Sequence, residues 1–186
     1  SDTTAEIQDL ADTGITTAND AIAVISAYNG TNTVPTIQHY ADAGVTGVTA
    51  ENLAAVNAQV ETASSDASDT TAEIQDLADT GITAANDAIA VISAYNGTNT
   101  VPTVQHYADA GVTGVTADNL AAVNAQVETA SSDASDTTAE IQDLADTGIT
   151  AANDAIAVIS AYNGTGTAPT VQQYIDAGVT GVTVEN

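Results

Sequence analysis

The amino-acid sequence repeats itself with a fixed period. The octapeptide Ser-Asp-Thr-Thr-Ala-Glu-Ile-Gln begins at Ser1, Ser68 and Ser135, which sets the period at 67 residues (68 − 1 and 135 − 68). Only three substitutions separate the first two copies: Thr17 against Ala84, Ile37 against Val104, and Glu51 against Asp118. Such a period is typical of tandem-repeat proteins, in which each unit buries a small core and is supported by its neighbours.

We therefore predict three domains: repeat 1 at 1–67, repeat 2 at 68–134, and a truncated repeat 3 at 135–186. The third copy ends before the Leu-Ala-Ala-Val-Asn-Ala-Gln-Val stretch that the other two contain, so its last helix is expected to be missing. We also expect the natural protein to be longer. Since the chain has no initiator Met and no apolar signal segment, any targeting signal is expected outside this window.

Composition narrows the classes of function. The chain has no Lys or Arg and 25 Asp and Glu, which gives a formal charge of −25. This charge disfavours nucleic acid as a partner and insertion into an anionic membrane, and it favours a medium rich in salt or divalent cations. The absence of Cys excludes thiol catalysis and disulfides. Tyr is the sole aromatic residue type, so Tyr28 and Tyr40 are predicted to fill the core of the first repeat.

Helix signals cross the boundary between copies. Thr49 is a plausible N-cap, and apolar or small residues then recur at alternating spacings of three and four from Leu53 to Leu77, as in a heptad seam. One interpretation is a continuous helix from about Ala50 to Ala78. The other breaks the helix at Ser64–Ser68 and begins a new one at the capping box Thr70-x-x-Glu73. The coincidence of Ser and Asp residues with that box favours the break.

Turn signals divide the remainder of the period. Gly81 is predicted to end a helix, and a second helix is expected from near Thr83 to the Asn96-Gly97 dipeptide. After a loop at 98–102, Thr103 is expected to cap a short helix that Gly111 ends, with Val104, Tyr107 and Ala108 facing inward. The predicted fold class is all-α: tandem small helical bundles, with three to four helices per repeat, arranged in series.

One segment resembles a known group of proteins. The run Tyr107-Ala-Asp-Ala-Gly-Val-Thr-Gly-Val-Thr-Ala-Asp-Asn-Leu-Ala-Ala-Val-Asn-Ala-Gln-Val127 is similar to helical tandem repeats of giant secreted bacterial surface adhesins, the type I secretion and RTX or biofilm proteins described from marine bacteria. The third copy, Ala168–Thr183, resembles them as well. The resemblance implies an extracellular or cell-surface location and a long repeat array that holds terminal binding domains away from the cell. It carries over no ligand-binding residue.

Pairs of aspartates are the candidate metal ligands. They occur at Asp9 and Asp12, at Asp76 and Asp79, and at Asp143 and Asp146. Their i,i+3 spacing places both carboxylates of a pair on one helical face. There they could bind Ca²⁺ together with further oxygen ligands from a neighbouring repeat. No loop resembles an EF-hand, so a solvated acidic face is the favoured interpretation and no cofactor is assigned.

Two other polar motifs recur. Asn29, Asn96 and Asn163 each begin an Asn-Gly-Thr glycosylation sequon, although Asn-Gly is also a strong turn dipeptide. His39 and His106 are the only side chains that titrate near neutrality, and the third copy has Gln173 instead. We therefore interpret these histidines as polar partners of the Thr caps rather than as catalytic or metal-binding groups.

The sequence favours a mechanical function. No Ser or Thr stands beside a His and a carboxylate in a nucleophile pattern and no phosphate loop is present, so an enzyme is not expected. The first hypothesis is a set of structural spacer repeats in a large extracellular bacterial adhesin or matrix protein, with neighbouring repeats of the same chain as partners. The alternatives are homo-assembly into an extracellular filament or sheath, and a helical surface module that binds a host protein or glycan.

Overall fold

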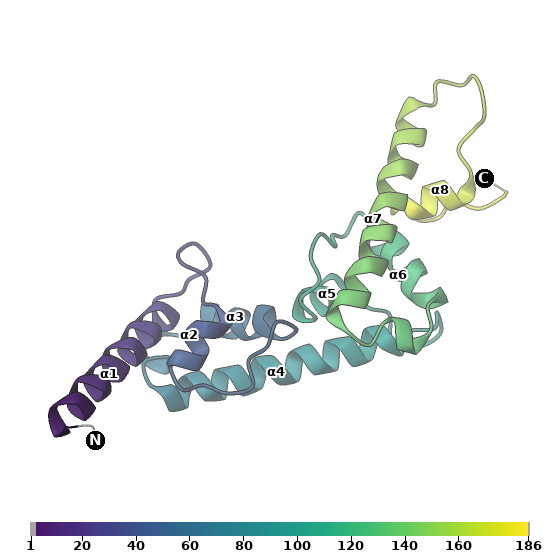
Figure 1. Ribbon diagram of the computed structural model, residues 1–186. Coiled ribbons are helices and arrows are strands. Elements are labelled where there is room, and N and C mark those ends of the chain that lie inside the picture. The colour runs from purple at the N-terminus through teal and green to yellow at the C-terminus, as the bar shows by residue number, and fades with distance from the viewer. Residues whose placement is uncertain (1–2, 186) are drawn as a thin grey trace. The chain divides into compact units, whose positions relative to one another are not determined.

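The computed structural model describes residues 3–185, and every regular element in that range is a helix (Figure 1). The predicted all-α fold class is confirmed. The α-helices are α1 (Thr4–Ser26), α2 (Ile37–Asp42), α3 (Leu53–Thr62), α4 (Thr71–Ser93), α5 (Val104–Asp109), α6 (Leu120–Thr129), α7 (Thr138–Ala161) and α8 (Val171–Asp176). Two 3₁₀ turns, η1 (Ser65–Ala67) and η2 (Ser132–Ala134), follow α3 and α6. A period thus holds one long helix, two short helices and one 3₁₀ turn.

A capping box opens each long helix. The Thr70 hydroxyl accepts a hydrogen bond from the backbone N–H of Glu73 at 3.3 Å, and the Glu73 carboxylate accepts one from the Thr70 N–H at 3.2 Å. Two otherwise unpaired backbone donors are satisfied in this way. The predicted break at Ser64–Ser68 is confirmed, and the alternative of a continuous helix to Ala78 is wrong. η1 occupies the break, and the nearly fully buried Ser68 follows it.

Gly81 does not end a helix, contrary to the prediction. α4 continues through it to Ser93, so the two helices expected on either side of Gly81 are one. The physical reason is packing: a Cβ atom at Gly81 would lie 2.6 Å from the Cα of Val56, inside any permitted contact. Glycine is therefore required here for close approach of two backbones rather than for a left-handed turn.

The start of α3 also differs from the prediction. Its N-cap is Asn52 rather than Thr49, and the helix begins at Leu53. The Asn52 side chain organises the preceding turn, since its Oδ1 accepts from the Thr49 N–H at 2.9 Å and its Nδ2 donates to the Gly47 carbonyl at 2.9 Å. An amide that bonds both ways closes this turn more completely than the Thr49 hydroxyl alone.

The short helix α5 ends as predicted, but Ala108, predicted to face inward, is exposed. α5 is capped by Thr103, and Gly111 follows its last turn at a φ of 76°. The Val112 N–H then donates to the Tyr107 carbonyl at 2.8 Å, and Val112 is buried against the same core as Tyr107. This is the glycine-ended stop with its apolar contact.

Two hydrophobic cores have the same composition. The chain divides into two compact units, Ser1–Ala85 and Asn86–Asn186, and each is described by itself. Every core residue of the second unit lies 67 positions after a core residue of the first. The buried members of the first core are Ala21, Ile25, Tyr40, Ala43, Val45, Val56, Val60, Ile74 and Ala78, and those of the second are Ala88, Ile92, Tyr107, Ala110, Val112, Val123, Val127, Ile141 and Ala145.

The core draws on both sides of the sequence boundary at 67/68. In the first unit, the second half of α1, together with α2 and α3, packs with the first half of α4. The division between the compact units accordingly falls inside α4, between Ala85 and Asn86. Because a period is cyclic, counting it from Ser1 or Ser68 is arbitrary, and a chain cut at Ser68 would separate α3 from the helix segment that covers it.

Tyr40 fills the centre of the first core, as predicted, whereas Tyr28 is half-buried at its edge. The Tyr40 hydroxyl donates to Asn57 Oδ1 at 2.7 Å, and Asn57 Nδ2 donates to the Pro35 carbonyl at 3.0 Å. The first bond satisfies the hydroxyl that the tyrosine brings into the core, and the second satisfies the amide of Asn57. Burial, with a smaller effect of Tyr28, raises the pKa of Tyr40 above its ordinary value.

Candidate functional site: the repeat-to-repeat face

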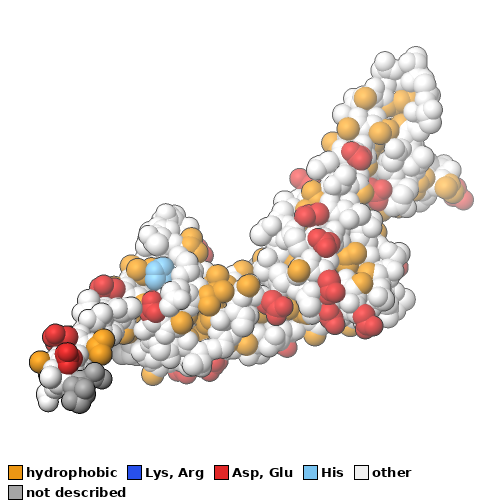
Figure 2. Space-filling view, in the orientation of Figure 1, with side chains coloured by type: hydrophobic (Ala, Val, Ile, Leu, Met, Phe, Trp, Pro, Cys, Tyr) orange, Lys and Arg blue, Asp and Glu red, His pale blue; other side chains and the backbone are white. Residues whose placement is uncertain are grey.

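The predicted aspartate pairs lie on exposed helix surface. Figure 2 shows carboxylates scattered over the visible face rather than gathered at one point. Asp79 accepts a hydrogen bond from the Gln75 amide at 2.8 Å, and Asp76 instead lines a shallow hollow with Asp66 and Glu73. Asp12 and Asp146 accept the same glutamine bond in their copies. Within residues 3–185 no group of three or more His, Cys, Asp or Glu is arranged to hold a metal ion. Calcium binding stays a prediction.

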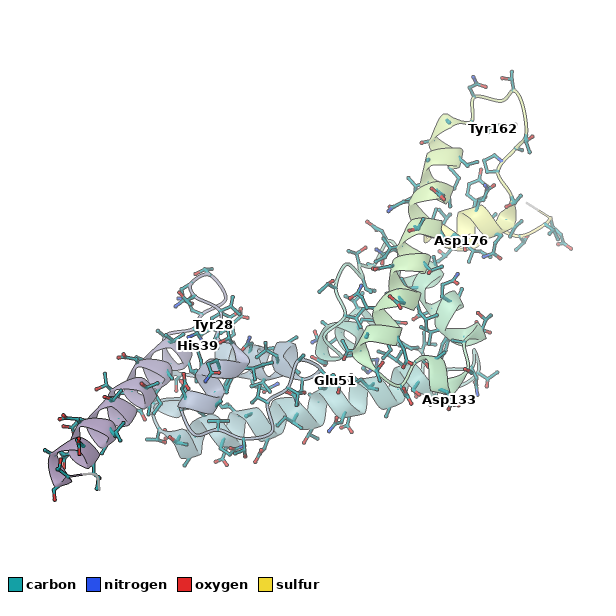
Figure 3. The ribbon with its side chains drawn as sticks, in the orientation of Figure 1. Tyr28, His39, Glu51, Asp133, Tyr162 and Asp176 are labelled. Atoms are coloured by element: carbon teal, nitrogen blue, oxygen red, sulfur yellow. The ribbon has the colours of Figure 1, made fainter. Side chains whose placement is uncertain are left out.

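The acidic hollow has an unusual pair of carboxyl groups beside it. A hydrogen bond with Glu73, and then the Glu73 charge, raise the pKa of Asp69. The hydrogen bond from the Thr70 hydroxyl is the largest cause that lowers the pKa of Glu73. The same shifts recur at Asp136 and Glu140 in the second unit, beside Asp133 (Figure 3). Capping of the long helix therefore shifts the pKa values of the two carboxyl groups in opposite directions.

The three sequon asparagines sit in turns. Asn29 Oδ1 accepts from the backbone N–H of Thr31 at 3.1 Å and from its hydroxyl at 2.8 Å. Asn96 and Asn163 make the same pair of bonds with Thr98 and Thr165. All three asparagines are exposed. This Asx-turn geometry accounts for the conformation of the motif, and glycosylation stays a prediction.

The histidines serve the caps, as the sequence indicated. His39, labelled in Figure 3, lies at the start of α2, and its Nδ1 accepts from the Thr36 N–H at 3.0 Å. His106 does the same with Thr103 at 3.1 Å. Gln173 Oε1 takes the identical role with Thr170 at 2.8 Å. The ring nitrogen Nδ1 thus has the same acceptor role in the cap as the amide oxygen of Gln173.

In each unit, one copy of the repeat packs on the next through a face that combines a close backbone contact with several polar bonds. We use "repeat-to-repeat face" for the first half of a long helix, residues 71–82 or 138–149, packed on the two short helices before it. Gly81 lies against the backbone of Ala55 and Val56 in α3, and Gly148 lies against Ala122 and Val123 in α6. A backbone-to-backbone approach of this kind is possible only where both surfaces are small.

Polar groups fix the register of this face. The Thr71 hydroxyl donates to the Ala43 carbonyl at 2.8 Å. The Gln75 amide bridges the turn after α2, because its Oε1 accepts from the Thr46 N–H at 2.8 Å and its Nε2 donates to the Thr46 carbonyl at 3.1 Å. Thr138 and Gln142 repeat these bonds in the second unit. Paired donors and acceptors of this kind penalise any slip of the helix along its groove.

Sequence reasoning missed the two residues that define the face, Gln75 and Gly81. The available signal was the apolar pattern that continues after Gly81 through Ile82, Ala85 and Ile89 at helical spacing. A glycine inside a continuing helical pattern points to close packing, whereas a glycine at its end points to a stop.

The chain was compared with known protein families, curated proteins and solved structures. No protein-family profile, curated protein or solved structure matches this chain. Among residues 3–185, none of the helices has the length and apolar character needed to cross a bilayer.

Proposed function

We propose that this chain consists of structural spacer repeats from a large extracellular bacterial adhesin or matrix protein. The observation that carries the proposal is the recurrence of one complete hydrophobic core, with the same packing and the same buried tyrosine network, at a constant interval of sequence. Repetition of a core together with its repeat-to-repeat face supports a function that depends on the number of units rather than on one site.

The surface supports the same proposal. A chain with 25 acidic residues and no Lys or Arg repels copies of itself and anionic polymers, which suits an array that must stay dispersed. The extracellular placement rests on this composition and on the resemblance of 107–127 to repeats of secreted adhesins. The repeat-to-repeat face is the means by which successive units would be held in series.

Small-angle scattering on chains of two, three and four periods tests the proposal. For a spacer, the maximum dimension increases by a constant increment with each added period. The measurement belongs in about 0.15 M salt, where charge repulsion beyond roughly 8 Å is screened and does not by itself extend the chain. A radius of gyration that follows the scaling of a single compact globule, about N to the power 0.38, would overturn the spacer function.

A further inference from the structure

The first half of α1 carries an apolar stripe that nothing covers. Ile7, Leu10 and Ile15 are exposed by 58%, 73% and 58%, and hydrophobic side chains are visible on this helix in Figure 2. The same residues recur in α4, where Ile74 is fully buried, and Leu77 and Ile82 are partly buried against the core. Since 1–15 and 68–82 are identical in sequence, only their surroundings make the difference.

The glycine shows the same contrast. A Cβ at Gly81 would meet the α3 backbone at Val56, whereas a Cβ at Gly14 would meet nothing within 4 Å. Likewise Ile82 reaches the turn at Gly47, where an added Cβ would lie 3.0 Å from its Cδ1. The exposed face of α1 around Gly14 therefore leaves room for the close approach of another helix backbone, as Gly81 does for α3.

The polar side chains of α1 already have the arrangement that their counterparts have in α4, where the helix is packed on α2 and α3. Gln8 donates to Asp12 at 2.7 Å, as Gln75 donates to Asp79 at 2.8 Å. Gln75 additionally bridges Thr46, and nothing in that bridge conflicts with the Asp79 bond. Gln8 therefore needs no rearrangement of its partner Asp12 to make an equivalent bridge, and ordering costs on docking are small.

We propose that the stripe of Ile7, Leu10, Gly14 and Ile15 is a docking face for the two short helices of a further copy of this repeat. The occupant is identified by the buried counterparts: α2 and α3 cover this sequence in α4, and α5 and α6 cover it in α7. Within the described residues α2 and α3 are already covered by α4, and α5 and α6 by α7, while α8 is not followed by a second short helix. A complete pair of short helices for this stripe therefore belongs to another repeat. The inference rests on the tandem array in the proposed function, and it adds the surface through which a preceding unit is held.

The test lengthens the chain by placing a second copy of residues 86–134 directly before Ser1, so that Ala134 of the added segment precedes Ser1 as Ala67 precedes Ser68. Amide hydrogen exchange is then compared between the original and lengthened chains. Docking predicts at least a tenfold slowing for residues 4–15, while residues 71–82 keep their original protection. A lengthened chain whose added segment carries Val123→Asp, which removes the packing surface opposite Gly14, is the matched control and should give no slowing.

Gly14→Ala supplies the second readout. In the original chain this substitution leaves the thermal midpoint unchanged or higher, because no atom lies near the added methyl group. In the lengthened chain it lowers the midpoint, as Gly81→Ala does. Unchanged exchange of residues 4–15 together with a harmless Gly14→Ala in the lengthened chain would overturn the docking face. Scattering on the same two chains tests the spacer separately, since docking without added length would contradict only the spacer function.

Discussion

Gly81 and Gly14 occupy the same position in identical stretches of helix and have different surroundings. Helix propensity alone disfavours both, since glycine in a helix interior costs about 1 kcal/mol relative to alanine. At Gly81 that cost is offset by an approach of two backbones that any larger residue would prevent. The consequence of a substitution at either glycine is therefore set by the neighbouring element and not by the local sequence.

Gly81→Ala is expected to destabilise the first unit by about 1–3 kcal/mol, since the added methyl group forces α3 and α4 apart. Gly14→Ala is expected to stabilise α1 by roughly 0.5–1 kcal/mol through propensity alone. Urea unfolding followed by circular dichroism measures both. If the two substitutions had effects of the same sign, the close approach at Gly81 would not be the reason for the glycine.

The buried tyrosines respond to alkaline pH. Burial raises the pKa of both Tyr40 and Tyr107 above the ordinary value of about 10. A group whose folded pKa is raised stabilises the fold below its unfolded pKa and loses that contribution as pH rises further. Stability is thus expected to be intact below about pH 10 and to fall above it. Absorbance at 295 nm should show two of the six tyrosines ionising only together with the loss of helical signal.

Tyr107→Phe tests the hydroxyl directly. It removes the 2.7 Å bond to Asn124 and leaves a buried amide oxygen without its donor, which costs about 1–3 kcal/mol. Tyr174→Phe is the control in the third copy, because Tyr174 is only half-buried and its change is expected to be near zero. Equal effects at the two positions would contradict a specific role for the buried bond.

At the scale of the element, each helix is delimited by signals within a few residues. The long helices begin at reciprocal Thr–Glu boxes, and α2, α5 and α8 begin at Thr–His or Thr–Gln boxes. A capping box needs an acceptor at its third helical residue, and the imidazole and the amide both provide one. This equivalence explains why Gln173 replaces the histidine without loss of the helix.

His106→Gln is accordingly expected to be neutral, whereas His106→Ala should cost a few tenths to about 1 kcal/mol, since the Thr103 N–H loses its partner. Thermal unfolding of the two variants measures the difference. A large loss in His106→Gln would mean that the ring performs a function other than capping.

At the scale of the whole molecule, charge is unbalanced. With a net charge of −25 and no Lys or Arg, interactions among the ionised side chains are repulsive at neutral pH. Like-charged neighbours on a helix destabilise it by about 0.2–0.5 kcal/mol per pair. The fold is therefore expected to depend on counterions more than a protein of mixed charge does.

Raising NaCl from about 0.01 M to about 1 M shortens the screening length from about 30 Å to about 3 Å and should raise the urea midpoint throughout. Ca²⁺ and Mg²⁺ compared at equal ionic strength test the aspartate pairs. Site binding predicts an extra stabilisation by Ca²⁺ that Asp76→Asn removes. If the two cations stabilise the protein equally, their effect is charge screening, and binding of Ca²⁺ by the aspartate pairs is contradicted.

The sequence by itself determined the period, the helical class, the glycine stops after α2, α5 and α8 and the capping role of His39, and it favoured the break before Thr70, because these features depend on contacts among residues close along the chain. Only the tertiary structure decided that Gly81 lies against the backbone of α3, and that Ile74 is buried while Ile7, in the same sequence, is exposed. Burial depends on which element packs opposite a side chain, and no local pattern contains that information.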